Sequence, residues 1–506
     1  MQKIDFRQRH ALYSVEETRV IERLAQTTLP PHTLMQRAGM AVAQLTMAIA
    51  PHSRRIWIAC GPGNNGGDGL EASIHLARWG KSVVVTWLGS PETAPPDAAA
   101  SCECAREAGV HFADEPPSDF DCCIDALLGV GGSRDPQGRM ADWIEHINNS
   151  SAIVLAVDIP TGLLADSGAV MQHWIKADHT LSLLTLKPGL FTAHGRDSSG
   201  TVWLDDLANT PFGGVDNEVI APVAWLAGAP ADIPRLHASH KGSYGDVAVI
   251  GGAPGMTGAA LLAASAALHA GAGRVFVGLL QHNTPALDTQ QPELMFRSIE
   301  SLDFRLMTVV AGCGGGNAMH EPLARIVASS ARLVMDADAI NSLASDTQLQ
   351  TLLCQRATRQ LSTVLTPHPL EAARLMDSSA QHVQSNRLQV AEQLSQRFKC
   401  TVVLKGSGTI IASPGQPPAI NPTGNARLAT AGTGDVLAGM IGARLAAQRS
   451  TFLAACDAVY WHGLRADRWP AQIPLTAGAL SSCTWHINTK VLKHHGIPAC
   501  DLHPDV

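Results

Sequence analysis

Two glycine-rich segments of this 506-residue chain carry polar residues whose types and spacing suit phosphate binding and proton transfer. Cys60–Gly69 contains five glycines and ends in Asn-Asn-Gly-Gly-Asp-Gly. Glycines let a backbone approach a ligand closely, and the N–H groups at the start of a following helix attract phosphate. Ala431–Asp435 reads Ala-Gly-Thr-Gly-Asp. An aspartate there can accept a proton from a hydroxyl while the turn stabilises a phosphoryl group in transfer. A purely structural turn is the alternative at both places.

Two aspartates follow apolar runs in the first half of the chain. Asp125 begins Asp-Ala-Leu-Leu-Gly, and Asp158 begins Asp-Ile-Pro-Thr-Gly. Ligands of an open parallel sheet bind at the carboxyl ends of its strands, so both aspartates are expected in one crevice with the first glycine loop. Asn65, Asp125 and Thr161 offer only oxygen ligands, which favour a hard cation over zinc. Helix capping is the alternative role for either aspartate.

Three further motifs in the second half suit a nucleotide site. Lys405-Gly-Ser-Gly-Thr409 follows an apolar run and could hold phosphates through charge and backbone donors, although its spacing is not that of a Walker loop. His368 lies between two prolines, which favours a rigidly presented side chain that faces a ligand. Asp336 and Asp338 follow another apolar run and could lie near a magnesium-bound nucleotide, with helix capping equally open.

The elements that position the first group of residues are predicted from apolar runs that alternate with helical patterns. Such runs are typical of a parallel sheet covered on both faces. Ser14-Val15-Glu16-Glu17 is a capping box that predicts a helix to about Gln26, and a second helix is expected from Pro31. We therefore predict a Rossmann-like three-layer domain over residues 1–215. Its predicted strands are 55–59, 82–88, 120–124, 153–157 and 180–184.

A second α/β series predicts a separate domain over residues 225–506. The chain is too long for one ordinary core, and residues 210–234 are rich in proline, glycine and alanine. The predicted strands are 247–250, 274–277, 308–311, 333–335, 363–365 and 402–404. An apolar helix is expected over 436–446, directly after the Gly-Thr-Gly-Asp turn.

Composition narrows the class of protein further. A net charge of −7 indicates no basic surface for nucleic acid. The eleven cysteines match neither a zinc pattern nor an even disulfide framework, so reduced and mostly buried thiols are expected. Charged residues interrupt the N-terminus, and the longest apolar stretch, 258–280, reads as a buried helix leading into a strand. We expect a cytoplasmic homo-oligomer that has no nucleic-acid or membrane partner.

The motifs of the first half resemble the NAD(P)HX epimerase family. They are Leu34-Met-Gln-Arg-Ala-Gly39, the Asn-Asn-Gly-Gly-Asp-Gly loop, Asp125-Ala-Leu-Leu-Gly and Asp158-Ile-Pro-Thr-Gly. That family interconverts the epimers at the hydrated C6 of reduced nicotinamide. The resemblance implies acid/base work for Asp158 and K⁺ binding by Asn65, Asp125 and Thr161. The residues it implies for the hydrate are Asn64, Asn65, Gly66, Gly67, Asp68, Gly129, Val130, Gly131, Gly132, Ser133, Arg134, Asp135 and Asp158. Gly-Val-Gly replaces the usual Gly-Thr-Gly at the start of the 129–135 loop.

The motifs of the second half resemble the ADP/ATP-dependent NAD(P)HX dehydratases, which have a ribokinase-like α/β fold. They run in order from His240-Lys-Gly-Ser-Tyr-Gly through Gly251-Gly, Gly258-Ala-Ala, Asp336-Ala-Asp-Ala, Thr366-Pro-His-Pro, Lys405-Gly and Asn421-Pro-Thr-Gly-Asn to Gly432-Thr-Gly-Asp. The resemblance implies a hydrate site of Ala259, Gly314, His368 and Asp435, with Asp435 catalytic. It implies a nucleotide site of Lys405, Gly406, Ser407, Gly408, Thr409 and Gly434. Gly312-Cys-Gly and His368-Pro-Leu-Glu depart from the usual Gly-Pro-Gly and His-Pro-Gly-Glu.

Together the resemblances imply an enzyme that epimerises NADHX and NADPHX and then dehydrates the S epimer with ADP, or with ATP, and Mg²⁺. The alternative is a ribokinase-like vitamin or sugar kinase with an accessory domain. Such a kinase would leave the Asn-Asn-Gly-Gly-Asp crevice unexplained. A non-catalytic nucleotide-binding or scaffolding protein is a third possibility, which the presence of Asp158 and the glycine loop disfavours.

Overall fold

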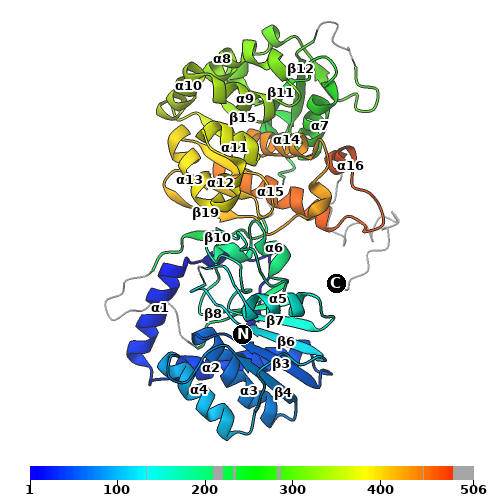
Figure 1. Ribbon diagram of the computed structural model, residues 1–506. Helices are drawn as coiled ribbons and strands as arrows, with labels where there is room; N and C mark the ends of the chain where they lie inside the picture. The colour runs from blue at the N-terminus through cyan, green and yellow to red at the C-terminus, as the bar shows by residue number, and fades with distance from the viewer. Residues whose placement is uncertain (133, 209–219, 232–234, 282–286, 448, 483–506) are drawn as a thin grey trace.

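The computed structural model describes residues 1–132, 134–208, 220–231, 235–281, 287–447 and 449–482. Two α/β parts are stacked, the first coloured blue to cyan and the second green to orange (Figure 1). Each part contains one sheet with buried hydrophobic residues on both of its faces, and one of the four hydrophobic clusters extends from the second part into the first. The predicted α/β class with layered sheets is therefore confirmed.

In the first sheet, the direction in which successive strands are added reverses between two central strands. Among the described residues its order is β1 (Gln2–Lys3), β9 (Thr201–Asp205), β8 (His179–Leu183), β7 (Ile153–Val157), β6 (Cys122–Ala126), β3 (Arg55–Cys60), β4 (Ser82–Trp87) and β5 (His111–Phe112). Neighbours are parallel except for β1, which is antiparallel to β9. The chain leaves β3 toward β4 and β5 and returns on the other side at β6. A crevice for ligands is expected at this switch point.

Helices of the first part cover both faces of its sheet. Buried residues such as Val42 and Leu70 form the core beneath α2 (Thr33–Ile49), α3 (Asn64–Arg78) and α4 (Pro96–Glu107). Trp57 and Trp143 are buried on the opposite face, where α5 (Arg139–Asn148) packs. The remaining helices are α1 (Val15–Thr28), the 3₁₀ turn η1 (Pro188–Leu190) and α6 (Gly195–Ser198).

The second sheet also reverses its order, between β11 and β14. Its described order is β13 (Met295–Phe296), β12 (Arg274–Leu279), β11 (Asp246–Gly251), β14 (Thr308–Ala311), β15 (Arg332–Met335), β16 (Ser362–Leu365), β17 (Thr401–Leu404), β18 (Ile410–Ser413), β19 (Gln416–Ile420), β10 (Ala224–Leu226) and β2 (His10–Leu12). The strands from β13 to β17 are parallel. Strand β18 is antiparallel to both of its neighbours.

Two groups of helices cover this second sheet. One face carries α7 (Thr257–His269), α14 (Thr433–Ala446), α15 (Thr451–Asp467) and α16 (Ala477–Ser482). The other carries α8 (His320–Ser329), α9 (Ala337–Ser345), α10 (Thr347–Thr358), α11 (Pro369–Met376), α12 (Ala380–Ser385) and α13 (Arg387–Phe398). The short 3₁₀ turns are η2 (Lys241–Tyr244), η3 (Ile299–Ser301), η4 (Phe304–Leu306), η5 (Gly316–Met319) and η6 (Ala426–Leu428).

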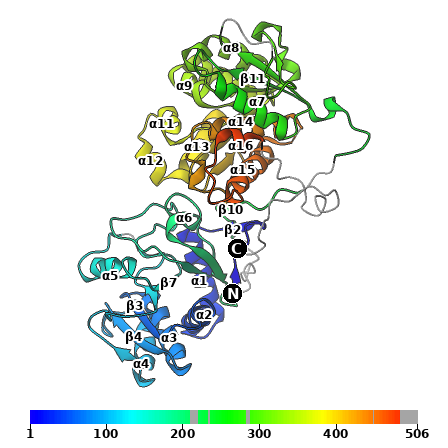
Figure 2. The same ribbon diagram turned by 90° about the vertical axis from the view of Figure 1, so that its right-hand side faces the viewer.

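The N-terminal segment contributes a strand to the second sheet. His10–Leu12 pairs antiparallel with Ala224–Leu226, which in turn pairs parallel with β19. Both β2 and β10 lie where the two parts meet (Figure 2). The sheet of the second part is thus completed by residues that lie between β1 and α1 of the first part in the chain. The boundary proposed between 215 and 225 stays a prediction, and residues 209–219 lie outside the described residues.

The predicted strands agree with the structure to within about two residues at each end. The largest shift is at 120–124, because Asp121 accepts hydrogen bonds from the N–H groups of Arg54 and Arg55 and the strand starts only at Cys122. The capping box at Ser14 is confirmed, since its hydroxyl accepts from the N–H of Glu17 and the Glu17 carboxylate accepts from the N–H of Ser14. The second helix begins at Thr33, after His32 in a left-handed conformation.

The contact between α7 and α14 predicts one strongly destabilising substitution. A Cβ at Gly439 would lie 2.0 Å from the carbonyl oxygen of Ala263. Gly439→Ala therefore forces two packed helices apart, which costs about 1–3 kcal/mol. We expect a fall of several degrees in Tm by differential scanning calorimetry. Gly478→Ala is the matched control, because nothing lies within 4 Å of a Cβ there. Equal Tm values for the two variants would contradict this packing.

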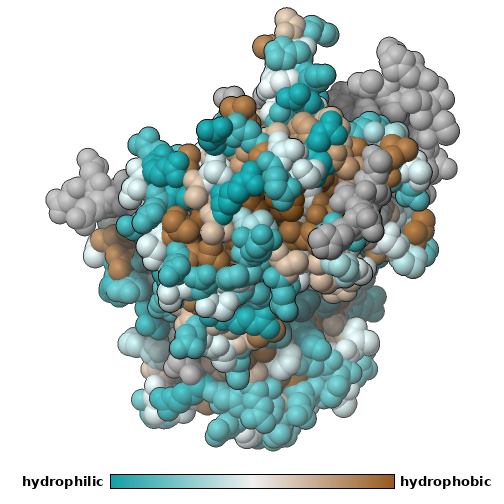
Figure 3. All heavy atoms as spheres, turned by 90° about the horizontal axis from the view of Figure 1, so that it is seen from above, coloured by the Kyte–Doolittle hydropathy of each residue, from teal (hydrophilic) through white to brown (hydrophobic). Residues whose placement is uncertain are grey.

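Within the described residues, no helix combines the length and apolar character needed to cross a membrane. The face of the second part shown in Figure 3 carries small groups of hydrophobic residues among hydrophilic ones.

Candidate active sites

The first crevice lies at the switch point of the first sheet and has a volume of about 420 Å³. The loop after β3, the loop after β6 and the end of β7 supply its floor, while α1 and α2 supply one wall. Predicted site residues that line it are Asn64, Asn65, Asp68, Gly129, Val130, Gly131, Gly132 and Asp158. The structure therefore gathers most of the predicted first site, and it adds Arg19, Glu22 and Asp97 to the lining.

The glycines of the first loop serve packing as well as ligand access. A Cβ at Gly61 would lie 1.7 Å from the Leu127 carbonyl oxygen, and one at Gly66 would lie 2.0 Å from the Gly61 carbonyl oxygen. Gly67 lies against Met35 and Ala98. Only glycines at these positions allow the start of α3 to pack this closely against the end of β6. This packing places Asn64, Asn65 and Asp68 of α3 at the crevice. The structural and ligand-binding interpretations of this loop are compatible.

Asp158 forms an ion pair with a lysine that the sequence motifs did not identify. Its carboxylate accepts from Lys187 Nζ, which also donates to the Leu183 carbonyl at 2.9 Å and to Ser182 Oγ at 3.2 Å. Lys187 is fully buried. Asp158 itself has φ 66°, an uncommon conformation for a residue with a side chain, which is held by its N–H bond to Leu181 O. The available signal in the sequence was Lys187 in Leu-Lys-Pro-Gly, four residues after the strand that ends at Leu183.

A buried oxygen cluster lies beneath the crevice. The Asp125 carboxylate accepts from Thr161 Oγ1 at 2.7 Å and from the Thr161 N–H at 2.9 Å. Both residues are fully buried, and burial raises the pKa of Asp125 to about 6. The side-chain amide of Asn65 has a buried nitrogen with no hydrogen-bond partner among the described residues. Rotation of that amide by 180° would present its oxygen instead, so the three residues fit an oxygen-liganded cation.

The end of the predicted 129–135 loop does not reach the crevice. Asp135 accepts hydrogen bonds from the N–H groups of Gln172 and His173, at 2.7 and 3.3 Å. Neither Asp135 nor Arg134 is among the residues that line the crevice, and Ser133 lies outside the described residues. Among the described residues of this loop, 129–132 line the crevice.

The crevice is rich in carboxyl groups that favour protons. Burial raises the pKa of Asp68 well above its ordinary value, and the charge of Asp158 adds to this effect. Burial, followed by the charge of Asp158, also raises the pKa of Glu22. Closely spaced acids with unequal proton affinity are suited to passing a proton to and from a bound molecule.

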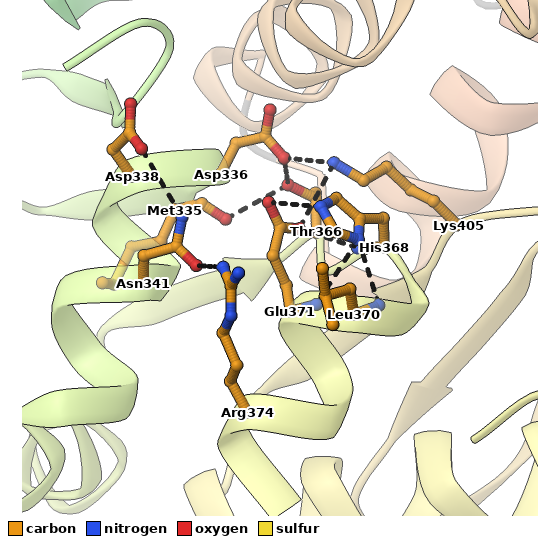
Figure 4. A network of polar contacts seen from close by, with 10 residues as sticks. All are labelled: Met335, Asp336, Asp338, Asn341, Thr366, His368, Leu370, Glu371, Arg374 and Lys405. Carbon is orange, nitrogen blue, oxygen red and sulfur yellow. Dashed lines mark hydrogen bonds and ion pairs between the residues drawn. The ribbon is translucent and has the colours of Figure 1, made fainter. Parts of the chain in front are cut away.

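The second site is built on a half-buried lysine and two buried carboxylates (Figure 4). Lys405 Nζ donates to Asp336 Oδ1 at 2.5 Å and lies 3.9 Å from Glu371 Oε2. Thr366 Oγ1 also donates to Asp336 Oδ1, at 2.6 Å. Burial alone lowers the pKa of Lys405, but Asp336 and Glu371 outweigh it and raise the pKa. Lys405 therefore stays charged beside the loop that follows it.

His368 begins α11 and is fixed at the edge of this network. Its Nδ1 accepts from the N–H groups of Leu370 and Glu371, and its Nε2 lies 3.2 Å from Glu371 Oε1. Burial raises the pKa of Glu371 to about 6. The side chain of His368 is 44% exposed, so the predicted rigid and accessible presentation is consistent with its geometry. Asp338 takes no part in the bonds to Lys405 and accepts instead from the side-chain amide of Asn341 (Figure 4). It also accepts from the N–H of Gly316 at 2.8 Å.

Asp435 lies in the first turn of α14, beside Asp336 and the buried Cys313 thiol. Ligand atoms of these three side chains lie within 4.8 Å of one another. Burial raises the pKa of Asp435 to about 7, and the Asp336 charge contributes. A carboxyl group with a pKa near neutrality is well suited to act as a general base. The neighbouring backbone is held by the buried His462, whose Nε2 lies 2.9 Å from the Thr433 carbonyl.

The second cleft, of about 510 Å³, opens beside the start of α14. Predicted nucleotide-site residues that line it are Lys405, Gly406, Ser407, Thr409 and Gly434. The Asn421-Pro-Thr-Gly-Asn loop lines its other side. Two residues of the first part, Arg196 and Asp197, also reach this cleft, and no motif in the sequence indicated them.

The predicted hydrate residues Ala259 and Gly314 lie at the switch point of the second sheet. A Cβ at Gly314 would lie 2.8 Å from the Ala259 Cβ, and Gly314 has φ 61°. These residues come from the start of α7, after β11, and from the loop after β14. They do not line the cleft that holds Lys405 and Gly434. Of the other predicted hydrate residues, Asp435 follows Gly434 in α14, and His368 lies against Glu371 of the Lys405 network.

Fold and sites define a two-domain α/β enzyme, in which a Rossmann-like crevice with a buried Lys–Asp pair is joined to a ribokinase-like nucleotide site. Two family models match: the YjeF-related protein N-terminus over residues 31–189 and NAD(P)H-hydrate dehydratase over residues 247–484.

Relatives cover both domains at once. The bifunctional NAD(P)H-hydrate repair enzyme Nnr of Escherichia coli (strain K12) is 36% identical over 90% of this chain and 89% of its own. The Coxiella burnetii enzyme of the same name is 34% identical over 90% of this chain and 94% of its own. A crystal structure of the ADP/ATP-dependent NAD(P)H-hydrate dehydratase from Bacillus subtilis, co-crystallised with ATP and Mg²⁺, is 27% identical, with a TM-score of 0.42 over 52% of this chain and 93% of that one. The chain belongs to the family of bifunctional NAD(P)H-hydrate repair enzymes.

Proposed function

We propose that the first domain interconverts the R and S epimers of hydrated NADH and NADPH, and that the second dehydrates the S epimer with ADP. The observation that carries the proposal is the pair of sites on one chain: Asp158 with Lys187 in the first crevice, and Asp435 beside the Lys405 cleft in the second. The dehydratase consumes one epimer and the first domain supplies it from the other.

In the first crevice, Asp158 is proposed to accept the proton of the C6 hydroxyl. The C6–N1 bond then opens, N1 is protonated, and reclosure on the opposite face of C6 inverts the centre. Lys187 holds the carboxylate in position through their ion pair. Asp68 and Glu22 are further carboxyl groups of the same crevice, and burial raises the pKa of both.

In the second site, Asp435 is proposed to deprotonate the C6 hydroxyl, whose oxygen attacks the terminal phosphorus of ADP. AMP leaves, and the C6 phosphate ester then departs as inorganic phosphate while the N1 lone pair forms an iminium. Loss of a proton from C5 restores the double bond of the dihydropyridine. Lys405 neutralises the transferring phosphoryl charge, and the N–H groups at the start of α14 stabilise its oxygens.

Two cations are proposed for these sites. K⁺ would be held by Asn65, Asp125 and Thr161, whose buried oxygens and orphaned amide fit it, and it would fix the loops around the first crevice. Mg²⁺ would accompany the nucleotide near Asp336 and Asp435, and it would supply charge neutralisation on the phosphates. We also propose a homo-oligomer, to be tested by light scattering.

The test is recovery of absorbance at 340 nm from a mixture of S- and R-NADHX with ADP and Mg²⁺. Recovery of nearly all the hydrate is expected, because both epimers reach the dehydratase. ATP in place of ADP checks the choice of donor. No recovery with either nucleotide would contradict the proposal and favour a small-molecule kinase.

The pH dependence of dehydration follows from Asp435. A general base works only when deprotonated, so a pKa of about 7 halves the active fraction near that pH. We expect kcat/KM for S-NADHX to fall about tenfold per pH unit well below pH 7 and to level off above it. A profile that is flat from pH 5.5 to 8 would contradict the role of Asp435.

A further inference from the structure

A segment of the first domain is bonded to the loop of the second domain that we propose for the nucleotide. The Ala193 N–H donates to Ser407 O at 3.1 Å, and Ser407 Oγ donates to Ala193 O at 2.8 Å. Thr192 Oγ1 lies 3.2 Å from Ser407 O and 3.1 Å from Gly408 O. The following short helix α6 lies at the junction of the two parts in both views (Figures 1 and 2).

The conformation of the nucleotide loop depends on this contact. Gly408 has φ 60°, and a Cβ there would lie 2.0 Å from Phe191 O, so the first domain approaches the loop as closely as glycine permits. Thr192 is buried and also accepts from Arg387 Nε at 3.1 Å. Arg387 in turn donates to the Lys405 carbonyl at 3.2 Å. One buried hydroxyl of the first domain thus links both ends of the Lys405–Gly408 turn.

Arg196 belongs to the first domain, and its positively charged side chain lies at the edge of the cleft in the second domain. Its Nη2 donates to Gly424 O at 2.8 Å, which fixes it to the Asn421-Pro-Thr-Gly-Asn loop. The side chain lines the same cleft as Lys405 and Gly434. A guanidinium has five donors in a planar fork, so the bond to Gly424 leaves donors for a second partner. Phosphate and carboxylate are the ligand groups whose geometry this fork matches, and the nucleotide proposed for this cleft supplies phosphate.

We propose that the first domain completes the nucleotide site of the dehydratase: Arg196 contacts the phosphates of the adenine nucleotide, and Thr192 positions the Gly406–Gly408 loop that cradles them. The proposal rests on the proposed function, since it assumes that ADP binds in this cleft. Its consequence is that nucleotide affinity depends on residues outside the dehydratase domain, so contact between the domains is part of the site.

The test is the Kd of ADP for the full-length chain by isothermal titration calorimetry. Arg196→Ala and Arg196→Gln are both expected to weaken binding at least about tenfold, because a charge-assisted bond to phosphate is lost. Gln can still donate to the Gly424 carbonyl, so its loss of affinity reports charge rather than structure. Arg196→Lys is expected to lose less, and Thr192→Val about threefold to tenfold. Arg78→Ala, an exposed arginine on α3, is the matched control and is expected to bind like the wild type.

The outcomes separate this proposal from the proposed function. Wild-type Kd values for Arg196→Gln and Arg196→Ala, in a chain that binds ADP, would overturn the phosphate contact and leave the proposed function standing. Failure of the wild-type chain to bind either ADP or ATP would overturn both. If Arg196→Ala does not fold, as judged by its Tm without ADP, the Gln and Lys variants decide the question.

Discussion

Asp435→Asn is expected to lower the rate of ADP-dependent dehydration by at least about a thousandfold. The amide has nearly the shape of the carboxyl group but cannot accept the hydroxyl proton. The variant should also lose the pH dependence near 7, because the group that titrates is gone. The measurement is recovery of 340 nm absorbance from S-NADHX with saturating ADP and Mg²⁺.

Two controls sharpen this result. ADP affinity of Asp435→Asn is expected to stay within a few fold of the wild type, since Lys405 and its loop remain. Asp303→Asn makes the same chemical change at a partly exposed residue paired with Arg305 in the same domain, and it should leave the rate unchanged. A rate for Asp435→Asn above about a tenth of the wild-type rate would contradict the assignment of Asp435 as the general base.

Asp158→Asn is expected to abolish epimerisation while dehydration of S-NADHX continues. A mixture of equal amounts of the epimers should then show rapid recovery of about half its absorbance, followed by a slow phase set by uncatalysed epimerisation. The wild-type chain should recover nearly all in one fast phase. The loss is expected to reach at least about a hundredfold in epimerisation rate, the scale of general acid–base catalysis.

The matched control is Asp142→Asn, at an exposed position on α5 of the same domain. Lys187→Met is a second variant, which leaves Asp158 without the cation that pairs with it, and it should also slow epimerisation. Full, single-phase recovery by Asp158→Asn would show that another group moves the proton. Asp68 would then be the next candidate, because it faces the same crevice with a raised pKa.

The sequence determined the two α/β series and indicated many of the residues that line the two candidate sites. Strands and motifs could be placed because glycine loops and acidic residues directly follow apolar runs, and parallel strands bring their carboxyl ends to one edge. That rule alone brought Asn65, Asp68 and Asp158 to one crevice. It also placed Lys405 and Gly434 at another. Local features such as the Ser14 capping box could also be predicted from the sequence, because the residues that form it lie within one helical turn.

Only the tertiary structure decided the contacts between distant segments. Lys187 lies 29 residues beyond Asp158, and nothing in the sequence states that its charge is buried beside that carboxylate. The pairing of His10–Leu12 with Ala224–Leu226 joins strands separated by the whole first domain. Arg196 reaches the nucleotide cleft only because the two domains pack together. The pKa of Asp435 near 7 likewise depends on burial and on Asp336, almost a hundred residues away. The motifs show which polar residues follow a strand. Burial and packing determine the pKa values of these residues and the residues that they contact.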